Sequence, residues 1–504
     1  MPAAKRKVLF VASECIPYAK AGGLGDVVGA LSKVLVKRGH DVRVLMPLYA
    51  SVDRARHGVH EVGSMCVHMG YGEENWVGLN ETVLDELVPV YMIDYRRFFD
   101  RPGIYGYPDD PYRFALLAKS ALQFALDTDF VPDVMHLHDW PTALVAAYLN
   151  TGTGKVAPLS RSASVLTIHN IMYQGKFETS ALGYIGLGFE HFNPDELEDH
   201  GGINLLKPGI HFADAITTVS PTHAREMMSP IGGHGLGPLL HRRETDLTGI
   251  LNGIDDDVWN PETDLLIPER FDAHDMHGKL KCKRTLQQRF DLEPRPDLPL
   301  LATVSRFVEQ KGFDLVRDAL PRALDALPIQ FVVLGSGDPA IEQFFRDLAA
   351  RYPGRVGMYV GYSEELAHLI EAGADLFLMP SLYEPCGLNQ MYSMRYGTLP
   401  IVRETGGLAD TVEDHDPESG SGTGFTFAPP DAGALYETIA RAVSTWFRHP
   451  AQIAQLRRRG MAKRFLWDAS AAAYEAVYER AIAARRATLS PAMDRIVRLA
   501  RGAA

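Results

Sequence analysis

Cysteines and long apolar segments are both scarce in the sequence. The four cysteines lie far apart, at Cys15, Cys66, Cys282 and Cys386. They form neither a Cys-x-x-Cys motif nor a Cys/His cluster, which argues against a disulfide framework or a zinc site and favours reduced thiols in a cytosol. Lys5-Arg6-Lys7 precedes an apolar run of about five residues, too short for a signal peptide or for a membrane span of roughly 20 residues. We therefore expect a cytoplasmic protein with no membrane partner.

An excess of positive charge is also absent. The formal net charge is −12 and the isoelectric point is near 5.8, which argues against nucleic acid or an anionic membrane as the main partner. Apolar residues make up 46% and charged residues 23% of the 504, which is ordinary for a globular protein. Because a chain of this length exceeds what one hydrophobic core usually supports, we expect two large domains, with room for a third.

Short apolar segments alternate with segments of helical spacing along the first half of the chain. A strand at residues 7–12, a helix at 24–37 and a strand at 41–46 predict a β-loop-α-β unit. Further strands are expected at residues 87–93, 134–137, 164–168 and 215–219. Alternation of this kind indicates a parallel sheet that is covered by helices on both faces.

The same pattern begins again after a polar, proline-bearing stretch at residues 252–268. Strands are expected at residues 300–304, 329–334, 356–360, 375–379 and 399–402, and an Ala-rich helix at about 467–485. We therefore predict an α/β protein with two doubly wound, Rossmann-like domains, at residues 1–252 and 253–466, and a C-terminal helix within 467–504. Ligands of such sheets bind at the carboxyl ends of the strands, so we expect the chemistry in those loops, with the two domains facing across a cleft.

A glycine-rich loop, Lys20-Ala21-Gly22-Gly23-Leu24-Gly25-Asp26, follows the first expected strand. Glycines such as Gly22 and Gly23 let backbone N–H groups approach a phosphate or a sugar closely, and Lys20 brings a positive charge. The loop is not the Gly-x-Gly-x-x-Gly motif of dinucleotide-binding proteins. A glycine-rich turn with an exposed lysine is the alternative interpretation.

Two histidine-bearing segments end strands of the first half, His136-Leu137-His138-Asp139-Trp140 and Thr167-Ile168-His169-Asn170. No carboxylate or cysteine cluster completes a metal site in the first segment, so core histidines are favoured there, with Asp139 free to bind a sugar hydroxyl. A histidine at the position of His169 can donate to a sugar oxygen or steady a reacting centre. A structural histidine is the alternative.

Two cations follow the first strand of the second half. In Ser305–Gly312, Arg306 lies at the strand end and Lys311 at the start of the next helix. Fixed cations there can neutralise a departing diphosphate, a role that a metal ion has in other transferases. Surface salt bridges are the alternative.

A second glycine-bearing loop, Glu384-Pro385-Cys386-Gly387-Leu388, opens a helix expected at residues 388–396. The free N–H groups of a helix start can meet a phosphate, whereas the carboxylate of Glu384 is better suited to sugar or ribose hydroxyls. Thr405-Gly406-Gly407-Leu408 repeats the order of strand, glycine and helix. A structural helix cap is the alternative.

Together these segments resemble the bacterial glycogen synthase and plant starch synthase family. The motifs, in chain order, are KAGGLGDVVGALSKVL, HLHDWPTALV, THNIMYQGKF, KPGIHFADAITTVSPTHARE, LNGIDDDVWNP, SRFVEQKGFDL and YEPCGLNQMYSMRYGTLPIVRETGGLADTV. They run from Val8 to beyond Phe427, so the resemblance covers most of the chain, and the last block is highly specific.

The resemblance implies a retaining glycosyltransferase of the GT-B type that needs no metal and no cofactor. The implied reaction moves glucose from a nucleotide sugar, preferably ADP-glucose, to the non-reducing 4-hydroxyl of an α-1,4-glucan such as glycogen or a maltooligosaccharide. The C-terminal helix would cross back to the first domain. The implied catalytic residues are Arg306 and Lys311 at the diphosphate, Glu384 at the donor sugar and His169 at the glucose. The implied substrate-binding residues are Lys20, Gly22, Gly23, Asp26, Asp139, Asn170, Asn252, Cys386, Gly387, Leu388, Thr405, Gly406 and Gly407.

The chain departs from the family pattern at Gly237-Pro238, where the family has an acidic residue and a glycine. Any contact made there to the acceptor or to the closing domain is put in doubt, whereas Asn389 in place of a threonine is a smaller change. Asp255-Asp256-Asp257 resembles the Asp-x-Asp signature by which other glycosyltransferases hold a metal. It lies in the expected interdomain stretch, away from the strand ends, so we expect no metal there.

Other functions stay open beside this one. A nucleotide-sugar epimerase also uses paired Rossmann domains. A non-catalytic glucan-binding protein would be expected to have lost Lys20, Arg306, Lys311 or Glu384, and all four are present. An NAD dehydrogenase is less favoured, because neither half has Gly-x-Gly-x-x-Gly with a downstream acidic residue. From the sequence, ADP-glucose and UDP-glucose both stay open as the donor.

Overall fold

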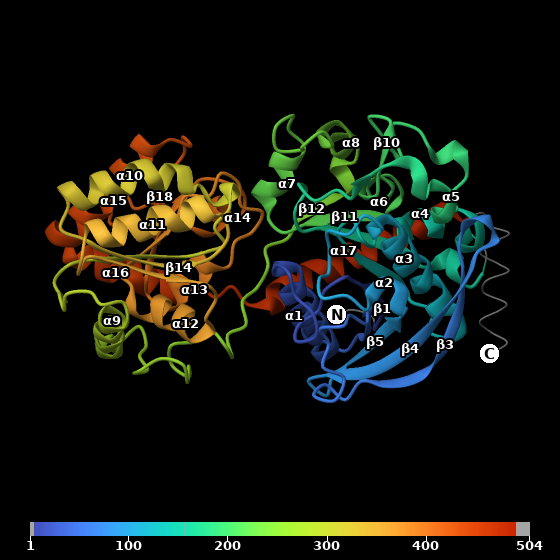
Figure 1. The fold of residues 1–504 in the computed structure, drawn as a ribbon, viewed down its shortest axis with the longest axis horizontal. Helices are drawn as coiled ribbons and strands as arrows, with labels where there is room; N and C mark the ends of the chain where they lie inside the picture. The colour runs from blue at the N-terminus through green and yellow to red at the C-terminus, as the bar shows by residue number, and fades with distance from the viewer. Residues whose placement is uncertain (1–4, 156, 490–504) are drawn as a thin grey trace. The chain divides into compact units, whose positions relative to one another are not determined.

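The computed structural model describes residues 5–155 and 157–489, which divide into two compact units. The first unit holds the described residues among 1–219, 224–250 and 467–504, and the second holds residues 220–223 and 251–466 (Figure 1). Each unit has parallel strands with helices on both faces of its sheet, so the predicted α/β fold class is confirmed. No helix in the described part of the chain is long and apolar enough to span a membrane.

The first unit is built on a nine-stranded sheet. Its strands, in spatial order, are β12 (Leu247–Gly249), β11 (Ala215–Thr218), β7 (Ala163–Ile168), β6 (Val134–His138), β1 (Lys7–Val11), β2 (Asp41–Pro47), β5 (Val88–Asp94), β4 (Glu74–Leu84) and β3 (His60–His68). The strands from β12 to β5 pair in parallel, and β4 and β3 extend the sheet antiparallel. The central strands are buried on both faces, which explains why they appear in the sequence as continuous apolar runs.

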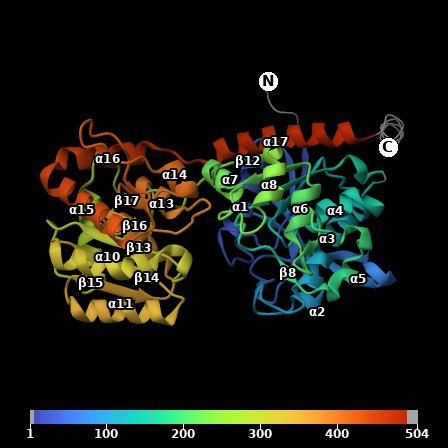
Figure 2. The same cartoon turned by 90° about the horizontal axis from the view of Figure 1, so that it is seen from above.

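Helices cover both faces of this sheet. They are α1 (Gly23–Lys37), α2 (Arg96–Phe99), α3 (Asp110–Asp127), α4 (Leu144–Asn150), α5 (Leu182–Ile185), α6 (Leu206–Phe212), α8 (Gly237–Arg242) and α17 (Trp467–Thr488), with α7 (Pro221–Met227) at the boundary and a small sheet of β8 (Lys176–Phe177), β10 (Gly202–Asn204) and β9 (Glu198–Asp199). The helix α17, the long red helix of Figure 2, packs against α1 and against β6, β7 and β11. Chain segments at opposite ends of the sequence therefore build one core.

The second unit has a six-stranded sheet in which all strands are parallel. Its strands, in spatial order, are β15 (Val356–Val360), β14 (Gln330–Gly335), β13 (Leu300–Val304), β16 (Leu376–Met379), β17 (Leu399–Arg403) and β18 (Phe425–Phe427). Alternate residues of each strand point to opposite faces: Leu301 and Phe331 join one core and Leu300 and Val332 the other.

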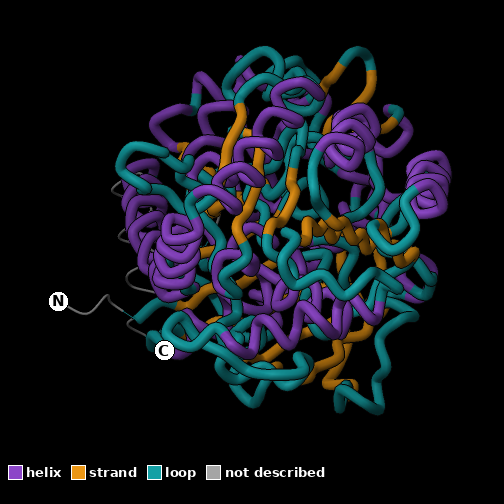
Figure 3. Tube along the Cα trace, turned by 90° about the vertical axis from the view of Figure 1, so that its left-hand side faces the viewer, coloured by secondary structure: helices purple, strands orange, loops and turns teal. Residues whose placement is uncertain are grey.

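Each of these two cores is closed by its own helices (Figures 1 and 3). The first core includes residues of α10 (Phe313–Ala326), α11 (Pro339–Arg351), α15 (Ala432–Arg448) and α16 (Pro450–Ala462). The second includes residues of α9 (His277–Arg289), α12 (Glu364–Gly373), α13 (Asn389–Arg395) and α14 (Gly406–Thr411). Because the strands between these layers are parallel, they all end at the same edge of the sheet, which is where the loops of interest lie.

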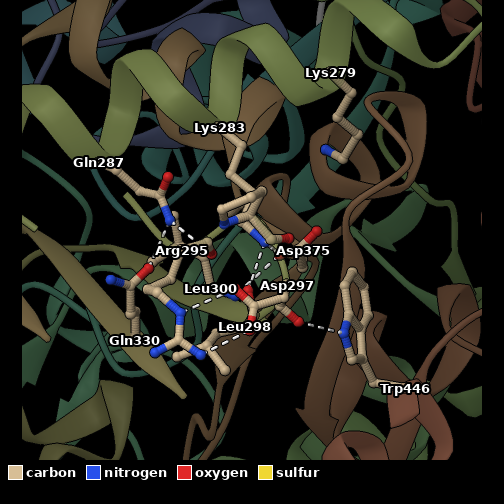
Figure 4. Close-up of polar contacts among 12 residues, drawn as sticks. Lys279, Lys283, Gln287, Arg295, Asp297, Leu298, Leu300, Gln330, Asp375 and Trp446 are labelled. Carbon is tan, nitrogen blue, oxygen red and sulfur yellow. Dashed lines mark hydrogen bonds and ion pairs between the residues drawn. The ribbon is translucent and has the colours of Figure 1, made fainter. Parts of the chain in front are cut away.

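One face of α9 buries polar side chains spaced four residues apart, Lys279, Lys283 and Gln287 (Figure 4). The Lys283 ammonium lies 2.7 Å from a carboxylate oxygen of Asp375 and donates to the Leu298 carbonyl at 2.5 Å. Gln287 donates to Gln330 at 2.7 Å. Since buried polar groups need partners, this row ties α9 to the sheet with directional bonds.

Candidate active site

The glycine loop of the first unit ends in an ion pair and opens α1. Lys20 lies 2.7 Å from Asp26, with both side chains partly exposed. Burial raises the pKa of Asp26, and the Lys20 ammonium opposes that rise. A Cβ atom added at Gly22 or Gly23 would meet no atom within 4 Å, so there is open space beside these two residues. The loop therefore has a cation, an anion and open space beside two glycines in one short segment.

The carboxylate of Glu14 holds this loop in place. Its Oε2 accepts hydrogen bonds from the N–H groups of Ala21 at 2.6 Å and Gly22 at 2.9 Å, and its Oε1 accepts one from the Tyr105 hydroxyl at 2.6 Å. Glu14 is buried. Two of the loop's N–H groups are thus bonded to a protein carboxylate, which leaves Lys20 and the start of α1, from Gly23 onward, to meet a ligand.

Asp139 and His169 meet where β6 and β7 end. Asp139 takes a left-handed backbone conformation, with φ at 58°, and its Oδ1 accepts the N–H of His169 at 2.7 Å. Burial raises the pKa of Asp139 to about 8, although hydrogen bonds from the backbone N–H groups of His169 and Asn170 partly oppose this rise. Burial also lowers the pKa of His169 to about 3, so the imidazole is neutral at physiological pH. Asn170 uses its own Oδ1 to accept the Met172 N–H at 3.1 Å, which closes a local turn.

In the second unit, Lys311 and Glu384 form a short ion pair across 73 residues of sequence. The Lys311 Nζ lies 2.6 Å from Glu384 Oε2, and the side chains are 19% and 8% exposed. The Ser381 hydroxyl donates to the same carboxylate oxygen at 2.9 Å. Arg306 is exposed at the end of β13. Two cations and one buried carboxylate therefore lie in the loops that follow β13 and β16.

Glycines allow three loops of this unit to pack backbone against backbone. A Cβ atom at Gly406 would lie 1.9 Å from the Glu384 carbonyl, one at Gly407 2.1 Å from the Cys386 carbonyl, and one at Gly312 2.0 Å from the Pro380 carbonyl. Gly406 and Gly312 also have positive φ, at 45° and 71°. No other residue type fits these positions without moving the backbone.

Cys386 and Asn252 lie side by side within the second unit. The Asn252 backbone N–H interacts with the Cys386 sulfur, and burial raises the pKa of this thiol to about 12. The Asn252 side chain is buried. Across the same loop, Asn389 donates to the Val304 carbonyl at 2.7 Å, which ties the start of α13 to the end of β13. Gly387, with φ at 73°, shapes the turn between Cys386 and this helix.

The aspartate triplet at residues 255–257 is part of the scaffold. Asp256 pairs with Arg395 at 2.9 Å and with Arg464 at 2.7 Å. Its carboxylate is thus committed to two guanidinium groups. Within residues 5–155 and 157–489, no three His, Cys, Asp or Glu side chains are grouped so that they could hold a metal ion.

Comparison with known proteins matches both halves of the chain to sugar-transferring families. Residues 7–242 match the family described as "Starch synthase catalytic domain", and residues 285–459 match "Glycosyl transferases group 1". Glycogen synthase 1 of Geobacter metallireducens is 47% identical over 95% of this chain and 97% of its own length. Glycogen synthase of Myxococcus xanthus is 45% identical over 94% of this chain and 99% of its own length.

The chain belongs to the glycogen synthase and starch synthase family. It is a glycosyltransferase.

Solved structures agree with this family membership. The catalytic domain of starch synthase IV from Arabidopsis thaliana, bound to ADP and acarbose, matches 95% of this chain and 100% of that one, with a TM-score of 0.88 and 36% identity. Sucrose-phosphate synthase from Thermosynechococcus elongatus matches at a TM-score of 0.58 with 18% identity, a likeness of fold. The family fold is GT-B, and the predicted fold and the predicted family are both confirmed.

Sequence reasoning missed two residues that hold the predicted ones, and it predicted a third, His138, only as a core histidine. Glu14 holds the glycine loop, Ser381 hydrogen-bonds to Glu384, and His138 contacts His169 at 3.0 Å between Nδ1 and Nε2. Each follows or ends a buried strand, and a polar residue at a strand end is a signal that could have found them. Of the predicted residues, Lys20 and Asp26 come together, as do Asp139 and His169, and Lys311 and Glu384.

Proposed function

We propose that this glycosyltransferase moves glucose from ADP-glucose to the non-reducing 4-hydroxyl of an α-1,4-glucan, with retention at the anomeric carbon and without a metal ion. The observation that carries the proposal is the ion pair between Lys311 and Glu384, which fixes a positive charge at the strand ends before any substrate arrives. The exposed guanidinium of Arg306 follows β13 on the same side of the sheet.

The leaving diphosphate is the group that these cations stabilise. As the bond between glucosyl C1 and the phosphate oxygen breaks, negative charge builds up on the diphosphate, and Lys311 and Arg306 neutralise it. One preorganised donor of this kind contributes roughly 3–4 kcal/mol to the transition state. Lys311 needs little reorganisation, because its ammonium already donates to Glu384 Oε2, which also accepts a hydrogen bond from the Ser381 hydroxyl.

Retention follows when the acceptor attacks on the face from which the diphosphate leaves. The glucan 4-hydroxyl forms the new bond to C1, its proton passes to a phosphate oxygen of the leaving group, and ADP is released. A retaining glycosidase instead uses a carboxylate nucleophile paired with a second carboxyl group about 5 Å away. Glu384 already accepts from Lys311 and Ser381, which fits a carboxylate that binds donor hydroxyls better than a nucleophile.

In the first unit, the proposal assigns binding of the glucosyl group and the glucan to strand-end residues and to the glycine loop. Neutral His169 donates a hydrogen bond to a glucosyl oxygen, and Asp139 binds a hydroxyl beside it, since the two residues follow the paired strands β6 and β7 and are joined by a hydrogen bond. Lys20 and Asp26 bind donor and acceptor at the glycine loop. In the first unit, Asn170 is assigned to sugar contacts. In the second unit, Asn252 and the loops at Cys386–Leu388 and Thr405–Gly407 are assigned to sugar and nucleotide contacts.

ADP-glucose is the proposed donor because the starch synthase IV structure that this chain matches was solved with ADP and acarbose. That relative is 36% identical to this chain. Cytoplasmic location is part of the same proposal, since a nucleotide sugar and reduced thiols are both found in a cytosol.

A donor competition tests the proposal. Equal concentrations of ADP-glucose and UDP-glucose are given to the protein with a maltooligosaccharide, and the products are measured for length and linkage. The proposal expects chains longer by single α-1,4-linked glucose units, made mainly from ADP-glucose. Free glucose, an epimerised sugar nucleotide or unchanged oligosaccharide would refute it.

A further inference from the structure

His138 is a buried histidine whose ring contacts the proposed catalytic histidine. Its Nδ1 lies 3.0 Å from His169 Nε2, and the two rings are 5.3 Å apart between centroids. The His138 side chain is fully buried, whereas His169 is partly exposed. His169 Nδ1 makes no hydrogen bond to another described residue, so it is the ring nitrogen that remains for a ligand.

The position of the proton between the two rings follows from the other nitrogen of His138. His138 Nε2 is buried and has no hydrogen-bond partner among the described residues. If that atom carried the proton, an N–H group would be buried without an acceptor, which is rarer in folded proteins than an unfilled acceptor. The proton therefore belongs on His138 Nδ1, which donates to His169 Nε2. His169, being neutral, then carries its own proton on Nδ1.

The neighbours of His138 hold its ring in the plane that this hydrogen bond needs. Phe10 packs on it at 5.1 Å and His136 at 4.3 Å between ring centroids. Both nitrogens of His136 are themselves engaged, one with the Tyr478 hydroxyl of α17 at 2.9 Å and one with Thr167 at 2.6 Å. A ring packed between two fixed neighbours cannot rotate to release His169.

We propose that His138 is a positioning residue that keeps His169 in its Nδ1–H form, so that His169 presents a hydrogen-bond donor to the substrate. The proposal rests on the role given above to His169 in the proposed function. A histidine tautomer is set by the bond that its other nitrogen makes. His138 thereby decides whether the ring nitrogen that faces the ligand is a donor or an acceptor.

Two substitutions of nearly equal shape separate the hydrogen bond from simple packing. His138→Asn places an amide nitrogen where His138 Nδ1 lies and keeps a donor for His169, whereas His138→Leu places a methyl group there. We expect His138→Leu to lower kcat by roughly 10–100-fold, by analogy with the loss seen when the residue that orients a metal-bound histidine is removed, with a smaller change in KM. We expect His138→Asn to recover most of that loss. Tyr148→Phe is the control. It removes the buried hydrogen bond that the Tyr148 hydroxyl donates to the Ile185 carbonyl at 2.7 Å, and its kcat should not change.

Side-chain ¹⁵N NMR of the substrate-free protein tests the tautomer without any activity, with His169 assigned by its loss in His169→Gln. We expect His169 protonated at Nδ1 in the unsubstituted protein and in His138→Asn. In His138→Leu we expect a mixture of both tautomers.

His169 protonated at Nε2 in the unsubstituted protein overturns the proposal, even if a variant fails to fold. Equal kcat and equal spectra for the Asn and Leu variants overturn it as well. A protein with the expected tautomers but no glucosyl transfer would keep the positioning role and refute the proposed function.

Discussion

The ion pair between Lys311 and Glu384 predicts that removing both charges restores the stability lost with the first charge but does not restore catalysis. Lys311→Met keeps the length of the side chain and leaves the Glu384 carboxylate with Ser381 alone. Removing one partner of a fully buried pair costs about 3–5 kcal/mol, and a surface pair is worth about 0–1 kcal/mol. With exposures of 19% and 8%, this pair lies between those cases, so we expect a loss of about 2–3 kcal/mol.

The double variant Lys311→Met/Glu384→Gln removes the unpaired carboxylate. The amide that replaces it still offers an oxygen to the Ser381 hydroxyl, so most of the lost stability should return. Glucosyl transfer should stay down by about 10²–10³ in both variants, because no positive charge replaces Lys311 at the diphosphate. The assays are calorimetric melting for stability and ADP release for turnover, with Lys311→Arg as the variant that keeps the charge.

Three results would refute this reasoning. Transfer restored to within tenfold in the double variant would mean that Lys311 only neutralises Glu384. Full stability in Lys311→Met would mean that the carboxylate does not depend on its partner. Near-normal transfer by Lys311→Met would remove Lys311 from the mechanism altogether.

Three further predictions concern stability. The pKa of Asp139 is raised to about 8, so between pH 3.8 and about 8 the folded protein binds a proton that the unfolded chain lacks. The melting temperature should therefore fall as pH rises through that window. Asp139→Asn should abolish this fall. Lys283→Met should lower the free energy of unfolding by about 3 kcal/mol, the low end for a buried pair, because its partner Asp375 keeps Arg457. Lys281 lies on the same helix and pairs with Glu269 at the surface, so Lys281→Met should cost under about 1 kcal/mol. Urea unfolding measures both. Hydrogen bonds from Arg38 lower the pKa of Glu475 from 4.5 to about 2. The stability that Glu475 contributes is therefore present above pH 4.5 and lost as pH falls toward 2. Glu475→Gln should lack this loss, and identical acid unfolding curves for the variant and the unsubstituted protein would contradict the prediction.

The parallel cores were the parts of the fold most open to prediction. The strands β1 and β13 are buried on both faces and read as short apolar runs between turn signals. The strand β3 was missed because it lies at the sheet edge with five exposed residues at its start and a register shift beside Gly63. The strand β18 has three residues after a polar loop, too few for a period to show.

The sequence predicts the candidate residues but not their hydrogen-bond partners. Lys311 and Glu384 each follow a strand and were chosen for that reason, but nothing local indicates that they bond to each other across 73 residues. Glu14 shows the same limit, because its role depends on the loop folding back onto it and on Tyr105, which is 91 residues away. Tight backbone packing at Gly406 and Gly407 also depends on a second loop.

The product's anomeric configuration tests the central claim most directly. ADP-glucose labelled with ¹³C at C1 is incubated with a short maltooligosaccharide, and the products are followed by NMR as ADP is released. The account predicts one new α-1,4-linked glucose at the non-reducing end for each ADP, with metal chelation making no difference. A β-linked product, label released as free glucose, or transfer that stops on chelation would contradict it.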